Sequence, residues 1–210
     1  MISALEALER LREGNQRFVE GNPRSHTMFT NPAHRSELIA GQHPFAVIIG
    51  CSDSRVPVEI IFDQSLGDLF VIRVAGNVVA PSQIGSVEFA AEQFGTRLVV
   101  VLGHSHCGAI SATLQQLQKP VENQSRNLRS IVNRIRPSVE GLLETDLKHD
   151  PDALAHHAMR TNVRVSASHL RHGSEILEQL IKTDDLLVVG AEYSLETGVV
   201  EFFDNMPSDD

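Results

Sequence analysis

The chain contains two cysteines, and each follows a short apolar run of the kind that forms a buried strand. Cys51 begins the segment CSDSR, and Cys107 ends the segment HSHC. Thiolate and imidazole ligands together select zinc over magnesium or calcium. Two thiolates and one imidazole are one ligand short of a tetrahedral shell, which is the arrangement of a catalytic zinc site.

The second segment offers two imidazoles. His104 lies three residues before Cys107 at a strand-to-helix turn, so both can face inward as the helix begins. His106 is the competing ligand, but from two residues before Cys107 it points elsewhere in most turn geometries. We therefore favour His104. Because there is no third cysteine, the fourth position is left to water or to the carboxylate of Asp53.

Asp53 and Arg55 are the other residues of the first segment that suggest chemistry. In an extended segment residues two apart point to one side, so Cys51, Asp53 and Arg55 can line one wall. A guanidinium can hold a carboxylate through two parallel hydrogen bonds and would keep Asp53 off the metal. Asp53 could then accept a hydrogen bond from a zinc-bound hydroxide. The competing interpretation is an ordinary, weakly stabilising surface ion pair.

Four apolar runs, at 45–49, 69–72, 98–102 and 186–189, predict strands covered on both faces. Residues 198–203 predict a further edge strand. Helical spacing predicts helices over 3–19, 84–94, 109–119, 128–136 and 152–182, and 21–42 reads as a loop with a short helix. The predicted helix over 84–94 lies between the strands at 69–72 and 98–102, and this order implies a parallel crossover connection. The expected fold is an α/β domain spanning 1–210, with a mostly parallel central sheet of four or five strands flanked by helices.

In an open parallel sheet, ligands bind outside the carboxyl ends of the strands. Cys51 follows the first predicted strand and His104 follows the third, so both emerge at the same edge. If these strands are neighbours, the two loops can share one ion.

The composition of the chain disfavours several classes of binding partner. The 210 residues carry a formal charge of −9 with no basic patch, which disfavours nucleic acid and anionic membranes. No apolar run is long enough for a membrane helix, and the first residues lack the pattern of a secretory signal. We expect a cytoplasmic protein, in which paired cysteines more often serve a metal or catalysis than a disulfide.

The paired motifs CSDSR and HSHCG resemble those of the β-class carbonic anhydrases, whose pattern is CxDxR followed by HxxC. The segments GNQRF (14–18), GDLFVIR (67–73) and AGN (75–77) also resemble family segments, so the likeness covers nearly the whole chain. It implies one zinc per subunit and a homodimer or dimer of dimers. It also implies that the N-terminal helix, within 1–20, packs on the partner subunit.

By that similarity, Cys51, His104 and Cys107 are zinc ligands, and Asp53 with Arg55 forms the catalytic dyad. The similarity assigns substrate contacts to Gln42, Phe70, Ala75, Phe89 and Gly108. Ala75 stands where plant-type enzymes have valine. Phe89 stands where a tyrosine contributes from the adjoining subunit, so a hydroxyl donor is lost. Ile48 replaces the tryptophan of the bicarbonate-regulated subtype, and we expect no regulatory site of that kind.

The activity implied is the reversible hydration of carbon dioxide to bicarbonate and a proton by a zinc-bound hydroxide. Hydrolases of carbonyl sulfide or carbon disulfide share these ligands and are the alternative within the fold. A non-catalytic zinc- or bicarbonate-binding module and a thiol redox sensor are further alternatives, although intact Asp53 and Arg55 favour an enzyme. An alcohol-dehydrogenase-like site is disfavoured because no G-x-G-x-x-G follows a predicted strand.

Overall fold

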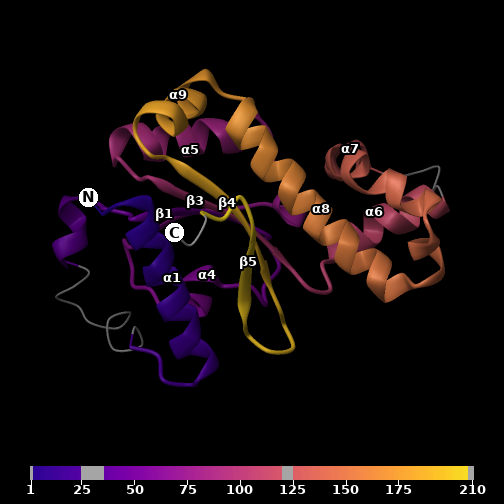
Figure 1. Ribbon diagram of the computed structural model, residues 1–210, viewed down its shortest axis with the longest axis horizontal. Coiled ribbons are helices and arrows are strands. Elements are labelled where there is room, and N and C mark those ends of the chain that lie inside the picture. Colours follow the sequence, from indigo (N-terminus) through magenta and orange to yellow (C-terminus); the bar gives the residue numbers. More distant parts are fainter. Residues whose placement is uncertain (1, 25–35, 120–124, 208–210) are drawn as a thin grey trace.

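The predicted strands form one five-stranded sheet in the computed structural model, which describes residues 2–24, 36–119 and 125–207 (Figure 1). The sheet order is β2-β1-β3-β4-β5. The first four strands are parallel and β5 is antiparallel to β4. The strands are β1 (Ala46–Gly50), β2 (Leu69–Arg73), β3 (Leu98–His104), β4 (Leu187–Tyr193) and β5 (Val200–Asp204). The prediction of a mostly parallel α/β fold is confirmed.

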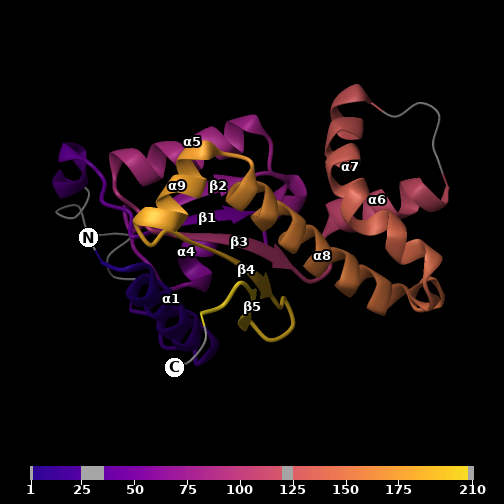
Figure 2. The same cartoon turned by 45° about the horizontal axis from the view of Figure 1, so that its top comes forward.

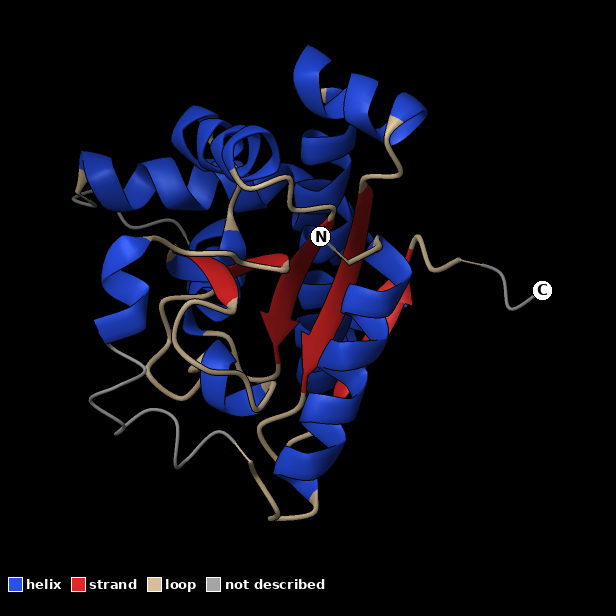
Figure 3. Cartoon of the chain, turned by 90° about the vertical axis from the view of Figure 1, so that its left-hand side faces the viewer, coloured by secondary structure: helices blue, strands red, loops and turns tan. Residues whose placement is uncertain are grey.

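Helices cover both faces of this sheet (Figure 3). One face carries α1 (Ala4–Val19) and α4 (Val58–Ile61). The other face carries α5 (Pro81–Gln93), α6 (Gly108–Gln118), α7 (Arg126–Val139), α8 (Pro151–His172) and α9 (Glu175–Thr183). Alternate residues of β1 enter the two cores, with Val47 and Ile49 on the second face and Ala46 and Ile48 on the first. Fully buried branched side chains of this kind each contribute roughly 1.5–3 kcal/mol.

Helix α1 begins where predicted, because the Ser3 hydroxyl accepts a hydrogen bond from the Glu6 amide at 3.1 Å. Its buried side includes Ala7, Leu8 and Leu11, which join the core between α1 and the sheet of the same chain. Leu5 of the same helix is 59% exposed in the single chain. Packing of this helix on a partner subunit stays a prediction, since a single chain does not test it.

Two predicted helix boundaries were wrong. Helix α7 continues through Pro137 to Val139, because Pro137 lies in the last turn, where the lost hydrogen bond is offset by burial of Ser138 and Val139. The segment 152–182 is two helices, because the Ser174 hydroxyl accepts a hydrogen bond from the Leu177 amide and starts α9. Within 21–42, a short 3₁₀ helix spans Leu38–Ala40, and residues 25–35 lie outside the described part.

The carboxyl ends of β1 and β3 lie side by side, since these strands are paired along their length and Gly50 aligns with Leu102. Strand β3 is longer than predicted and includes His104. Helices α6 and α7 and the start of α8 project beyond this edge of the sheet (Figure 2). None of the described helices is long and apolar enough to cross a membrane.

Candidate metal centre

Cys51, His104 and Cys107 converge at the carboxyl edge of the sheet. One ligand atom from each lies within 4.8 Å of the other two, and all three residues are buried. The predicted meeting of the two loops is therefore confirmed. His106 lies outside the cluster. Its backbone is in the left-handed region with φ of 54°, and its side chain is exposed and paired with Glu196.

The His104 ring is oriented as a ligand. Its Nδ1 lies 2.8 Å from the Ser105 carbonyl oxygen, so Nδ1 carries the proton. Its Nε2 is buried and has no hydrogen-bond partner in the described part of the chain. A buried nitrogen lone pair without a donor costs free energy unless another group engages it, and a metal ion in this cluster would do so.

The two thiols also suit a metal. The pKa of Cys51 is lowered to about 4, chiefly by its hydrogen bond with Cys107 and against the effect of burial. The pKa of Cys107 is raised, because Cys107 shares its proton with Cys51 and is buried. These opposite shifts describe two neighbouring sulfur atoms that share one proton. Metal binding would release the remaining proton.

Asp53 and Arg55 form the predicted bidentate pair. Arg55 Nε donates to Asp53 Oδ1 at 2.9 Å and Nη2 donates to Oδ2 at 2.7 Å. The guanidinium holds the pKa of Asp53 well below its usual range. Oδ2 of Asp53 lies 3.9 Å from Nε2 of His104, so the ionised carboxylate stands beside the cluster. Arg55 also donates to the His106 carbonyl at 3.2 Å, which links the two loops.

Arg73, at the end of β2, was not predicted as a site residue. Its guanidinium donates to the carbonyl of Cys51 at 3.0 Å and to the carbonyl of Asp53 at 2.5 Å. It therefore fixes the backbone that carries one ligand and the dyad carboxylate. Its place at the carboxyl end of a predicted strand, where ligands bind in a parallel sheet, could have indicated Arg73 as a site residue.

The loop with His104 and Cys107 is tied to the segment after β4. The Ser105 amide donates to the Tyr193 carbonyl at 3.0 Å, and the Ser105 hydroxyl donates to Glu196 at 2.8 Å. The Ser105 hydroxyl has the largest effect on the pKa of Glu196, which it lowers to about 2 together with the backbone amide of Glu196 itself, Ser194 and His106. Glu196 was not predicted, because it is brought to the loop by the turn that follows β4.

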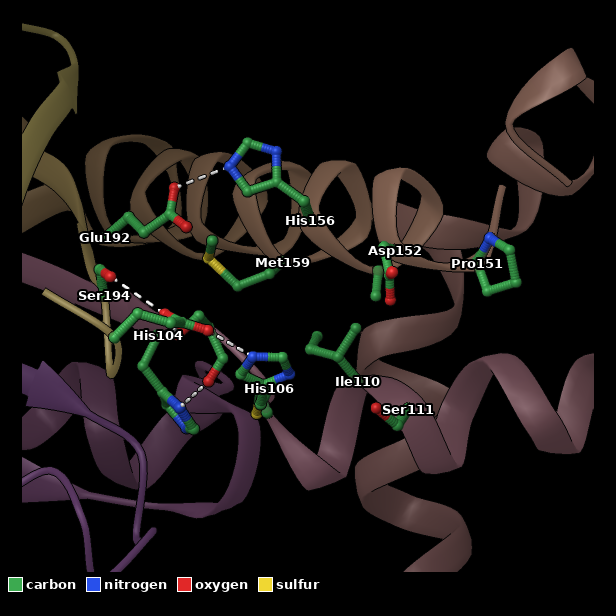
Figure 4. Close-up of a pocket in the computed structure, with 14 residues that line it drawn as sticks. His104, His106, Ile110, Ser111, Pro151, Asp152, His156, Met159, Glu192 and Ser194 are labelled. Carbon is green, nitrogen blue, oxygen red and sulfur yellow. Dashed lines mark hydrogen bonds and ion pairs between the residues drawn. The ribbon is translucent and has the colours of Figure 1, made fainter. Parts of the chain in front are cut away.

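A pocket of about 560 Å³ adjoins this loop, between α6, α8 and the end of β4 (Figure 4). His104 and His106 form one wall, and His156 and Glu192, joined at 3.2 Å, lie on another. Asp53 and Arg55 are not among the residues that line it. The dyad is therefore not part of the wall of this pocket.

The residues predicted to contact substrate divide into two groups. Gly108 directly follows Cys107, and Ala75 precedes Gly76, whose amide contacts Cys51. Phe70 instead aligns with Val47, three residues before the end of β1, which places it about 10 Å back along the sheet. There it packs on Phe89 and on Phe94.

Gln42 lies before the amino end of β1, at the end opposite Cys51. Within one chain, Gln42, Phe70 and Phe89 are thus apart from the cluster. Their role as substrate contacts stays a prediction.

Comparison with known proteins identifies relatives that match most of the chain. The family described as carbonic anhydrase matches residues 46–200. Carbonic anhydrase 2 of Mycobacterium tuberculosis is 38% identical over 197 residues, covering 91% of this chain and 89% of that protein. The carbonic anhydrase of Mycolicibacterium smegmatis is 38% identical over 195 residues, covering 93% and 91%.

Solved structures agree. The β-carbonic anhydrase CafA of Aspergillus fumigatus has a TM-score of 0.74 at 25% identity, covering 98% of this chain and 92% of that one. One of two tetrameric β-carbonic anhydrases of Sordaria macrospora shares the fold, with a TM-score of 0.74 at 22% identity over 94% of this chain and 97% of that one. By sequence family and by fold, this chain belongs to the β-class carbonic anhydrases.

Proposed function

We propose that the protein catalyses the reversible hydration of carbon dioxide to bicarbonate and a proton, with one zinc ion held by Cys51, His104 and Cys107. The observation that carries the proposal is the convergence of these three buried ligand atoms beside an ionised carboxylate. Two soft thiolates suit zinc, and so does an imidazole whose Nε2 has no hydrogen-bond partner among the described residues.

The metal and Asp53 have different roles in this proposal. When bound, zinc supplies the Lewis acidity that lowers the pKa of a coordinated water toward neutrality, as is established for carbonic anhydrases. Asp53 is assigned the orienting role. Because it is ionised, it can only accept hydrogen bonds, so it would hold the hydrogen of the attacking oxygen and leave a lone pair for the carbon of carbon dioxide.

Arg55 and Arg73 fix Asp53 in that role. Arg55 engages both carboxylate oxygens, which keeps Asp53 charged and directs it away from the ligand position. Arg73 holds the carbonyls of Cys51 and Asp53, so the ligand and the carboxylate are positioned together. Placing these groups before substrate arrives removes an entropic cost from the reaction.

A second copy of the chain completes the substrate pocket in this proposal. Phe89 is 50% exposed on α5, and Phe70 lies beside it on the edge strand β2. These aromatic residues lie too far from the cluster to contact its substrate within one chain. A homodimer, or a dimer of dimers, would bring Gln42, Phe70 and Phe89 to a neighbouring centre. A cytoplasmic location would keep the ligand thiols reduced.

Stopped-flow hydration of carbon dioxide, combined with metal analysis of the purified protein, tests the proposal. We expect one zinc per chain. We also expect the rate to rise from about pH 6 to pH 9, because two thiolates neutralise the zinc charge and weaken its effect on water. A metal-free protein without hydration activity, or a strong preference for carbonyl sulfide over carbon dioxide, would overturn it.

A further inference from the structure

Behind Cys51 lies a short turn that follows β2. The amide of Gly76 in this turn donates a hydrogen bond to Sγ of Cys51 at 3.3 Å, and the contact is buried. A hydrogen bond to a metal-binding thiolate withdraws electron density from sulfur and fixes the direction of its lone pairs. Whatever holds Gly76 in place therefore acts on the metal centre.

The turn at Gly76 has no freedom to accept a side chain. Gly76 adopts the left-handed conformation, with φ of 67° and ψ of 23°. A Cβ at this position would lie 2.8 Å from Cδ1 of Ile135 on α7 and 3.0 Å from Cβ of Ala109 on α6. Two helices thus enclose the turn, and both the positive φ and the close neighbours favour glycine at this position.

A third helix supplies the polar contact. Asn162 on α8 is 2% exposed, and its Nδ2 donates to the Gly76 carbonyl at 2.8 Å. Since a carbonyl oxygen only accepts, the amide must present its nitrogen, and this leaves Oδ1 toward Ser138 Oγ at 3.4 Å. The Ser138 hydroxyl lies 2.5 Å from the Ile135 carbonyl, so its contact with Asn162 is the weaker of the two.

We propose that Asn162 is a positioning residue for the metal centre, which holds the Gly76 carbonyl and thereby aims the Gly76 amide at the Cys51 sulfur. The mechanism above does not use Asn162, and the residue touches neither substrate nor metal. It acts through the peptide units on either side of Gly76. The inference rests on the proposed role of Cys51 as a metal ligand.

A matched control exists on the opposite face of the sheet. Asn15 on α1 is also buried, and its Nδ2 donates to the carbonyls of Ile61 at 3.2 Å and Gly198 at 2.9 Å. Replacing either asparagine by leucine, which has a similar shape, removes a buried donor and leaves carbonyl oxygens unsatisfied. Both variants should lose thermal stability, but only Asn162 bonds a residue whose amide donates to a sulfur of the cluster.

The experiment uses cobalt(II)-substituted protein, in which the thiolate-to-metal charge-transfer band reports on sulfur directly. We expect Asn162→Leu to move this band to longer wavelength and to speed metal loss to a chelator by about 10- to 100-fold. Asn15→Leu should leave the band and the rate unchanged. Asn162→Ala should move the band in the same direction. This smaller variant serves as the test if the leucine variant does not fold.

Two outcomes contradict the inference in distinguishable ways. If the parent protein binds cobalt with a thiolate band and both Asn162 variants give the same band and rate, Asn162 has no positioning role, while the proposed metal site stands. An equal shift in Asn15→Leu would assign the effect to general destabilisation. If the parent protein shows no thiolate band, the metal site itself is wrong and the inference is wrong with it.

Discussion

Two aspartate–arginine pairs in this chain have similar contacts and different surroundings. Arg17 Nε donates to Asp63 at 2.6 Å, across a sequence separation of 46 residues, and the Asp63 side chain is fully buried. The Arg24 amide also donates to both Asp63 oxygens. Asp53 pairs with Arg55 two residues away, and the Arg55 side chain is 52% exposed.

The difference shows how one kind of ion pair can serve structure or chemistry. At Asp63 both oxygens are taken by groups that join α1 to the end of α4, so the pair ties distant segments together. At Asp53 the partner comes from the same loop, so the ion pair itself joins no distant segments. That carboxylate faces His104 instead, where it is available to a third group.

The largest effect that separates the two pairs is expected from Asp53→Asn. Turnover in stopped-flow hydration should fall by about 10²- to 10⁴-fold, because a neutral amide cannot act as the ionised acceptor. Zinc content by metal analysis should stay at the parent level, since the three ligands are untouched. Full activity in a zinc-loaded Asp53→Asn protein would show that the dyad has no catalytic role.

The matching change at the other pair, Asp63→Asn, should affect stability. Asparagine cannot neutralise the guanidinium of Arg17, which is 18% exposed, and it leaves buried hydrogen-bonding groups at position 63 unsatisfied, so the free energy of unfolding should fall by about 1–3 kcal/mol. Urea unfolding measures this loss, and turnover per folded molecule should not change. If Asp63→Asn unfolds at the same urea concentration as the parent but has a lower turnover, the Asp63 pair serves catalysis and not stability.

Arg55→Lys tests whether geometry or charge matters at the site. Lysine keeps the positive charge but loses the planar fork that engages both Asp53 oxygens, so turnover should fall by about 10- to 100-fold. The decrease should be smaller than in Asp53→Asn. Parent-level turnover at equal zinc content would mean that a point charge suffices.

The sequence predicted the parts of the site that depend on local spacing. Cys51 and His104 end apolar runs whose pairing follows from the parallel crossover, so their convergence could be expected from topology. The pair of Asp53 and Arg55 lies within one extended loop, where residues two apart share a side. The strands were also predicted closely, because continuous apolar runs are a local signal of strands buried on both faces.

Contacts between distant segments escaped prediction. Asn162 lies 86 residues from Gly76, and nothing in its neighbourhood distinguishes it from other polar residues of a helix. Glu196 reaches Ser105 only because of the turn after β4. Pro137 was misjudged because proline is a local signal, which the packing of α7 overrides.

The smallest expected effect concerns acid stability at the Asp53–Arg55 pair. The pKa of Asp53 is lowered by folding from its ordinary value of 3.8, so its contribution is complete above that pH and is lost as pH falls toward the lowered value. Because the Arg55 side chain is exposed, water screens the pair, and its contribution to stability at neutral pH should be small. The difference in unfolding free energy between the parent and Asp53→Asn should therefore be small at pH 7 and should shrink below the ordinary pKa of 3.8. Urea unfolding across this range measures it, and a difference that grows as the pH falls would mean that Asp53 does not fold as the ionised partner of Arg55.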